Sequence, residues 1–120
     1  MKYAFLIALL AAPAAAQDYI IRDSDAVPSR DQLAETILDR DLEFFDGGVS
    51  HYATDSSYAW TYAAENGGGI WIGTHAINDD ATVCVTFETN VERCDMFVIA
   101  GERLVMLSSD GQRFPVREIR

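Results

Sequence analysis

The stretch ATVCVTFETNVERCDMFVIA, residues 81–100, decides the fold class of this chain. In its first half, Val83, Val85 and Phe87 alternate with Cys84, Thr86 and Glu88, the period of two that is typical of a β-strand. A second apolar run follows the polar Thr89-Asn90 pair and places Cys94, Met96 and Val98 on one face. The two runs therefore predict an antiparallel hairpin that turns at Thr89.

The hairpin carries both cysteines of the chain, Cys84 and Cys94, equally far from Thr89. Antiparallel pairing about that turn sets them opposite each other, where Cα atoms are about 4.5 Å apart and a disulfide is possible. A slip of one residue would move the sulfurs to opposite faces, so the bond would also fix the register. Closing so short a loop would stabilise the fold by about 2–3 kcal/mol. The alternative is that two reduced cysteines fill core space.

Residues 1–16 have the features of a secretory signal peptide. Lys2 provides the positive start, residues 4–12 provide an apolar run, and small residues end the segment at Ala16. The apolar run is shorter than the roughly 20 residues that a membrane-spanning helix needs. We therefore expect cleavage before Gln17 and a periplasmic or secreted protein with no membrane anchor, in a compartment where disulfides persist.

The chain is strongly acidic, with a net charge of −10. The leader contains the only lysine and no acidic residue, so its removal would shift the net charge to −11. Nucleic-acid binding requires a cationic surface, and an anionic membrane would repel this one. We therefore expect no nucleic-acid partner and look instead for an unknown protein or small-molecule ligand.

The length remaining after the leader suits one domain with one core. We expect an N-terminal arm over residues 17–28, in which residues 19–21 add a short edge strand and residues 23–25 form a polar turn. A single β-domain should span residues 29–120. Ser29 and Gln32 have the spacing of a capping box, which predicts a short amphipathic helix ending near Asp39.

Short apolar runs separated by tight turns fill the rest of the chain, so we expect antiparallel neighbours along a meander. The expected strands are 42–45, 49–53, 58–63, 70–77, the two runs within 81–100, 103–109 and 112–119. Apolar residues on both faces of several strands favour a curled sheet, and Pro115 should place the last strand at an edge or beside a bulge. The predicted fold is all-β with one short N-terminal helix, an antiparallel meander of about eight strands forming a small barrel or half-barrel.

Catalytic and metal-binding patterns are weak. His51 and His75 are not embedded in a recognised ligand spacing, so we expect neither a metal site nor a cofactor. Ser50 and His51 are neighbours on a predicted strand and point to opposite faces, so they cannot act as nucleophile and base. The sequence therefore favours a non-catalytic binding or structural module, with no catalytic residues. The alternative is a small periplasmic hydrolase that uses acidic residues with His51 or His75.

One aromatic cluster is the candidate binding site. Tyr58, Trp60 and Tyr62 should share a strand face, and the glycine-rich loop at 67–69 should return Trp71 beside them. These four residues would line an apolar ligand pocket or a sugar-stacking surface at the mouth of a barrel. The alternative, which the sequence favours, is an ordinary core packed from cross-strand aromatic residues.

Six motifs carry a resemblance to a known group of proteins. They lie at residues 42–48 (LEFFDGG), 58–62 (YAWTY), 69–74 (GIWIGT), 83–87 (VCVTF), 93–96 (RCDM) and 111–116 (GQRFPV). The set resembles small secreted proteobacterial β-meander domains of uncharacterised function. The resemblance implies a lipocalin-like barrel or half-barrel with paired cysteines, and it implies no catalytic residues. Asp55-Ser56 departs from the Asp-Gly that such domains often have at the second turn.

Overall fold

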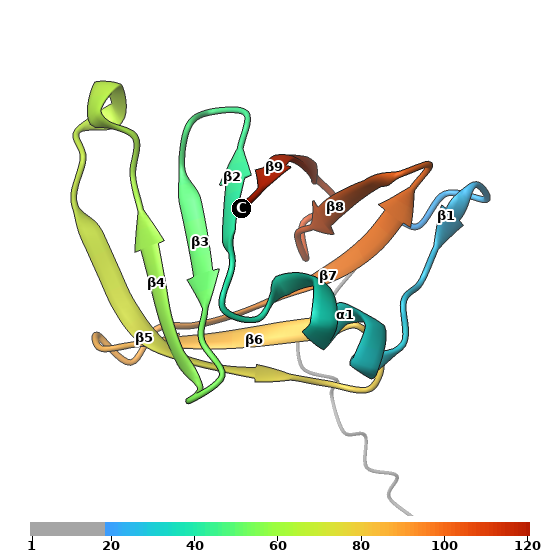
Figure 1. Ribbon diagram of the computed structural model, residues 1–120, viewed down its shortest axis with the longest axis horizontal. Helices are drawn as coiled ribbons and strands as arrows, with labels where there is room; N and C mark the ends of the chain where they lie inside the picture. Colours follow the sequence, from blue (N-terminus) through green and yellow to red (C-terminus); the bar gives the residue numbers. More distant parts are fainter. Residues whose placement is uncertain (1–18) are drawn as a thin grey trace, which may run out of the picture.

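Eight antiparallel strands follow one another around a closed barrel in the computed structural model, which describes residues 19–120 (Figure 1). Each strand pairs with the next along the chain, and the last pairs with the first, which confirms the predicted meander and selects the closed barrel. The barrel strands are β2 (Asp41–Phe44), β3 (Val49–Tyr52), β4 (Ser57–Thr61), β5 (Ile70–Ile77), β6 (Thr82–Phe87), β7 (Glu92–Ala100), β8 (Arg103–Leu107) and β9 (Arg113–Ile119).

The predicted signal peptide, residues 1–16, and its cleavage site before Gln17 lie outside the described residues. Within residues 19–120, no helix is both long and apolar enough to cross a bilayer.

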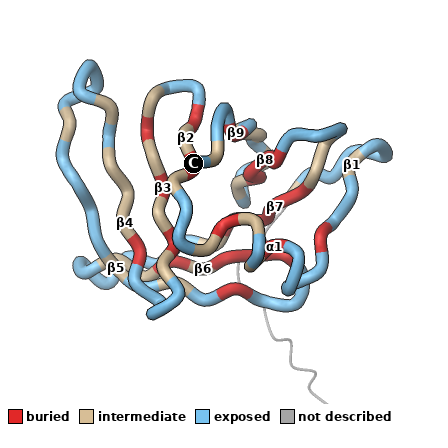
Figure 2. Tube along the Cα trace, viewed as in Figure 1, coloured by how far each residue is buried: buried red, intermediate tan, exposed pale blue. Residues whose placement is uncertain are grey.

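Alternation of side chains along each strand separates the barrel interior from its outer surface. On β6, Val83 and Val85 belong to the main core, and Phe87 packs against it. On β7, Phe97 joins the same core, whereas Met96 and Val98 form a second apolar cluster on the outer face with residues of β8. Both faces of β7 are therefore covered, and residues 95–98 form a continuous buried run, drawn in red in Figure 2.

The cysteine hairpin has the predicted register. Cys84 of β6 pairs with Cys94 of β7, and their sulfur atoms are bonded at 2.04 Å. The disulfide shares the outer face of the barrel with Met96, because both Cys94 and Met96 alternate with inward-facing residues. The bond therefore locks the β6–β7 register without occupying interior space.

Helix α1 (Arg30–Ile37) closes one end of the barrel. Its capping box is present as predicted, with reciprocal bonds between Ser29 and Gln32. Leu33 and Ile37 have no exposed surface and join the main core. The helix stops before Asp39, which takes a positive φ of 59° and donates its backbone N–H to Tyr52 at 2.7 Å.

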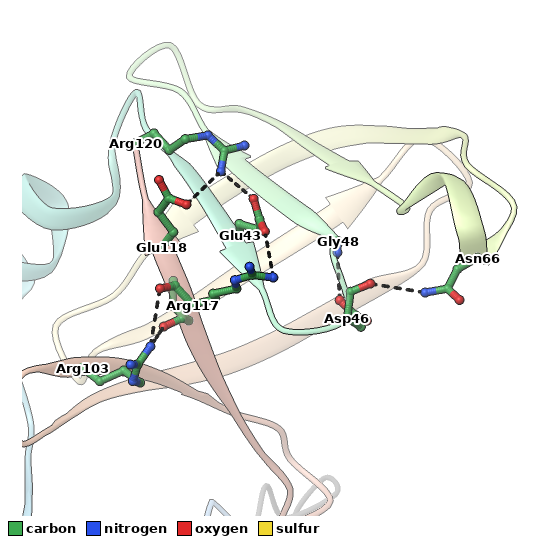
Figure 3. A network of polar contacts seen from close by, with 9 residues as sticks. Glu43, Asp46, Gly48, Asn66, Arg103, Arg117, Glu118 and Arg120 are labelled. Carbon is green, nitrogen blue, oxygen red and sulfur yellow. Dashed lines mark hydrogen bonds and ion pairs between the residues drawn. The ribbon is translucent and has the colours of Figure 1, made fainter.

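The seam between β2 and β9 contains a bulge, and ion pairs from Glu43 to Arg117 and Arg120 cross the seam beside it (Figure 3). Glu43 pairs with Glu118, but Phe44 pairs with Val116, so the residue between has no partner on β2. A bulge leaves ladder groups unpaired, and here Arg103 donates to the Val116 carbonyl at 2.7 Å. Pro115 immediately precedes Val116, the residue at which the β2–β9 pairing ends. Strand β9 lies between β2 and β8, so the predicted bulge is present near Pro115 and the strand is not at an edge.

The N-terminal arm crosses the outer face of the barrel. The expected edge strand at residues 19–21 is absent, and a two-residue strand β1 (Asp25–Ala26) pairs with the end of β7 instead. Tyr19 packs against the outer apolar cluster and donates its hydroxyl to the Cys94 carbonyl at 2.8 Å. A turn closed by the hydrogen bond from the Asp25 backbone N–H to the Arg22 carbonyl directly precedes this strand.

Candidate functional site

The end of the barrel opposite α1 is open. Because the strands alternate in direction, the turns after β2, β4, β6 and β8 meet at this end, whereas α1 lies against the turn after β5. A cavity of about 680 Å³ opens between these turns and descends into the barrel. This volume lies within the range of about 300–1,000 Å³ that is usual for small-molecule sites.

Aromatic side chains from six strands, β2 to β6 and β9, form the wall of the cavity. Phe87 of β6 contacts Trp71 edge to face, with ring centroids 6.0 Å apart, and it contacts Tyr58 at 5.9 Å. Trp60 of β4 lies 6.0 Å from Phe44 and 5.6 Å from Tyr62. Phe45 of the β2–β3 turn, Tyr52 of β3 and Phe114 of β9 complete the wall. An apolar or aromatic molecule of matching size would find contact surface on every side.

All four aromatic residues predicted from the sequence line this cavity, but they differ in burial. Tyr58 is 7% exposed, Trp60 is half-buried, Tyr62 is 40% exposed and Trp71 is 47% exposed. The preferred prediction that the cluster is simply core therefore describes Tyr58, whereas Tyr62 and Trp71 lie at the mouth. The two interpretations apply to different depths of one cavity.

The floor of the cavity is polar. The hydroxyls of Ser50 and Tyr58 lie 2.8 Å apart, and burial raises the pKa of Tyr58 to about 12. The Nε of Arg93 donates to a carboxylate oxygen of Asp95 over 2.7 Å. Burial raises the pKa of the Asp95 carboxyl, although the hydrogen bond from Arg93 acts in the opposite direction. The site is therefore amphipathic, with aromatic walls above a hydrogen-bonding floor.

Hydrogen bonds connect two turns at the rim. Asp46 accepts a hydrogen bond from the Gly48 backbone at 2.8 Å, and its own carbonyl accepts one from Asn66 in the β4–β5 loop (Figure 3). Gly48 must lack a side chain because a Cβ there would overlap the ring of Trp60. The rim loops thus support Trp60 from behind and leave its ring against the cavity.

The two histidines lie apart from the cavity wall. His51 faces outward on β3, and its Nδ1 lies 2.8 Å from Asp41, with both side chains more than two-fifths exposed. His75 on β5 faces inward near the closed end. Its Nε2 lies 2.8 Å from the Ala53 carbonyl, which fixes Nε2 as the donor, and its buried Nδ1 has no partner among the described residues. Strand β4 separates the two histidines in the sheet.

The polar floor was not among the predictions from the sequence. The alternation that places Phe97 in the core also places Arg93 and Asp95 inside the barrel, because the three residues share one face of β7. Two charged residues on the inward face of a buried strand are unusual, and this pattern was the available signal. Within residues 19–120, no group of histidine, cysteine or acidic side chains has the arrangement of a metal site.

Comparisons with protein-family models, curated proteins and solved structures find no match to this chain. The candidate site is therefore defined by its geometry alone.

Proposed function

We propose that this protein is a non-catalytic binding module that takes a small, mainly apolar ligand into the open end of its barrel. The observation that carries the proposal is the cavity of about 680 Å³ with aromatic walls and a mouth formed by Tyr62 and Trp71. Apolar cavities with a few convergent polar groups are the usual form of small-molecule sites. The competing hydrolase hypothesis has a histidine–carboxylate pair in His51 and Asp41, but that pair lies outside the cavity.

We also propose that the protein works outside the cytoplasm, as one of the small secreted bacterial β-domains that its motifs resemble. The predicted leader over residues 1–16 and the disulfide between Cys84 and Cys94 support this localisation. Intact-mass measurement of the exported protein should give a chain that begins at Gln17. A mature chain that retains the leader would contradict the proposed localisation.

Tryptophan fluorescence tests the binding proposal directly. Trp60 and Trp71 are the only tryptophans and both line the cavity, so any occupant should change their emission. Titration with neutral apolar probes, such as N-phenyl-1-naphthylamine and decanol, should give saturable changes with a stoichiometry of one. An absence of saturable binding for every neutral apolar probe would refute the proposal.

A matched pair of variants locates the bound probe. Trp71 and Ile72 are neighbours on β5 and are each 47% exposed, but of the two only Trp71 lines the cavity. Trp71→Ala should weaken probe binding about tenfold, as measured by calorimetry, because a large aromatic contact is lost. Ile72→Ala should leave the affinity within about twofold of the parent, since its side chain points away from the cavity. Equal effects of both changes would place the probe elsewhere.

A further inference from the structure

The guanidinium of Arg93 is only partly used by the protein. Its Nε binds Asp95 at 2.7 Å, and among the described residues its terminal nitrogens have no hydrogen-bond partner. Half of the Arg93 side chain is accessible, whereas Asp95 beside it is 8% accessible. Because Arg93 lines the cavity, its terminal N–H groups are available to a molecule that enters the barrel.

The position of Arg93 sets the direction in which a ligand would lie. Arg93 is opposite Val85 in the β6–β7 ladder, so it lies deeper along that hairpin than Phe87, and half of its side chain is accessible. Tyr62 and Trp71 line the same cavity at its mouth. A ligand that binds Arg93 through its polar end would therefore place its apolar body between the aromatic walls.

The floor selects the chemistry of that polar end. Arg93 can only donate hydrogen bonds, and its planar fork fits the paired oxygens of a carboxylate or phosphate. Asp95 already accepts from Nε, so the outward edge of the guanidinium presents donors alone. A cationic head would be repelled there, and a hydroxyl would use only part of the donor set.

We propose that the natural ligand is an amphipathic molecule whose anionic, oxygen-rich head binds Arg93 while its apolar body fills the aromatic part of the cavity. This inference rests on the proposed function of the barrel. The negative surface of the protein opposes anions at a distance, but physiological salt screens that repulsion beyond about 8 Å. The contact with Arg93 forms at short range in the cavity, where the local donor groups outweigh the distant surface charge.

Asp95 limits the strength of this site. Its carboxylate competes for the same guanidinium and repels an arriving anion at short range. Loss of the Asp95 charge should therefore strengthen anion binding, and loss of the Arg93 charge should weaken it. An incidental structural ion pair would not produce these opposite effects on one class of ligand.

The test compares probes that share one alkyl chain and differ in their heads. Decanoate, decyl phosphate and decyl sulfate supply anionic heads, decanol a neutral head and decyltrimethylammonium a cationic one. Each is titrated below its micelle concentration into the purified, disulfide-bonded protein and followed by calorimetry and tryptophan emission. We expect at least one anionic probe to bind about tenfold or more tightly than decanol. The order among the three anions identifies the preferred head.

Variants then assign the head to Arg93. Arg93→Met should remove the preference for anions, whereas Asp95→Asn should raise anion affinity several-fold. Because Arg93→Met alone leaves Asp95 unpaired, the double variant with Asp95→Asn provides a folded comparison that lacks both charges. It should bind decanol and show no preference for anions. Arg117→Met, a change at an exposed arginine on the outer surface, is the control and should alter nothing.

The two proposals fail in different ways. Equal affinity for anionic, neutral and cationic probes, or an anion preference that survives in the double variant, would overturn the assignment to Arg93 while leaving the apolar cavity as a binding site. Failure of decanol and every other probe to bind would overturn both proposals.

Discussion

The carboxylate of Asp25 accepts two hydrogen bonds from the guanidinium of Arg113, at 2.8 and 2.9 Å, across 88 residues of sequence. Asp25 belongs to the N-terminal arm and Arg113 to the last barrel strand, so the pair fastens the arm to the barrel. The Asp25 side chain is fully covered and Arg113 is 15% exposed. A bidentate pair in this setting is stronger than a typical surface ion pair.

The Asp25–Arg113 pair predicts a defined acid sensitivity. The hydrogen bonds from Arg113 lower the pKa of Asp25 to about 2. A carboxyl with a lowered pKa in the folded state contributes its stability above its ordinary value near 3.8, and loses that contribution as the pH falls through about 2. Arg113→Gln should therefore cost about 1 kcal/mol at neutral pH. In denaturant melts from pH 7 to 2, the difference between parent and variant should hold to about pH 4 and then vanish. A constant difference over the whole range would contradict this account.

Removal of the disulfide should reduce stability without changing the fold. Replacing Cys84 and Cys94 together by alanine frees a hairpin that is otherwise held by backbone hydrogen bonds, and the sulfurs occupy the outer face. We expect a loss of about 2–3 kcal/mol in urea, with an unchanged circular dichroism spectrum. Reductant should lower the stability of the parent by a similar amount and leave the double variant unaffected. Retention of full stability by the reduced parent would rule out a stabilising role for the bond.

The aromatic residues of the cavity should differ in their effect on stability according to depth. Tyr58 is buried, so Tyr58→Ala should cost about 3–5 kcal/mol. Trp71 is about half exposed at the mouth, so Trp71→Ala should cost about 1 kcal/mol or less while it weakens probe binding. Chemical denaturation of both variants provides the comparison. A large stability loss for Trp71→Ala would show that the mouth is part of the core.

Gly73 should be intolerant of a side chain. It pairs with Tyr58 on one side and Phe87 on the other, and a Cβ there would overlap the Thr86 carbonyl. Gly73→Ala should cost about 2–3 kcal/mol, because the backbone of β6 must move. Gly68→Ala is the control, since a Cβ at that loop position meets nothing within 4 Å and only its positive φ opposes the change, by about 1 kcal/mol. Equal losses of stability in the two variants would mean that the backbone of β6 moves to accommodate the new Cβ without strain.

Local sequence patterns predicted a large part of the architecture. The capping box at Ser29 and Gln32 depends on neighbouring residues, and the structure forms it as predicted. The alternation on both sides of Thr89 sets the register of the cysteine hairpin, because a slip of one residue would turn the apolar side chains outward. The same period brought Tyr58, Trp60 and Tyr62 onto one face. These features could be predicted from the residues' secondary-structure propensities, the periodicity of apolar side chains and the residues that favour turns.

Closure of the barrel and the composition of its floor depended on contacts between distant segments. The β2–β9 pairing joins the two ends of the meander, and no short-range pattern distinguishes it from an open half-barrel. The arm strand at Asp25–Ala26 forms because Arg113 and the free edge of β7 lie within reach, whereas propensity favoured residues 19–21. The sequence by itself thus determined the strands, the turns, the helix cap and the disulfide, since each depends on residues near one another in the chain. Only the tertiary structure decided that the barrel closes and that Arg93 and Asp95 face its cavity. The surroundings of this charged pair consist of side chains from strands that are distant in the sequence.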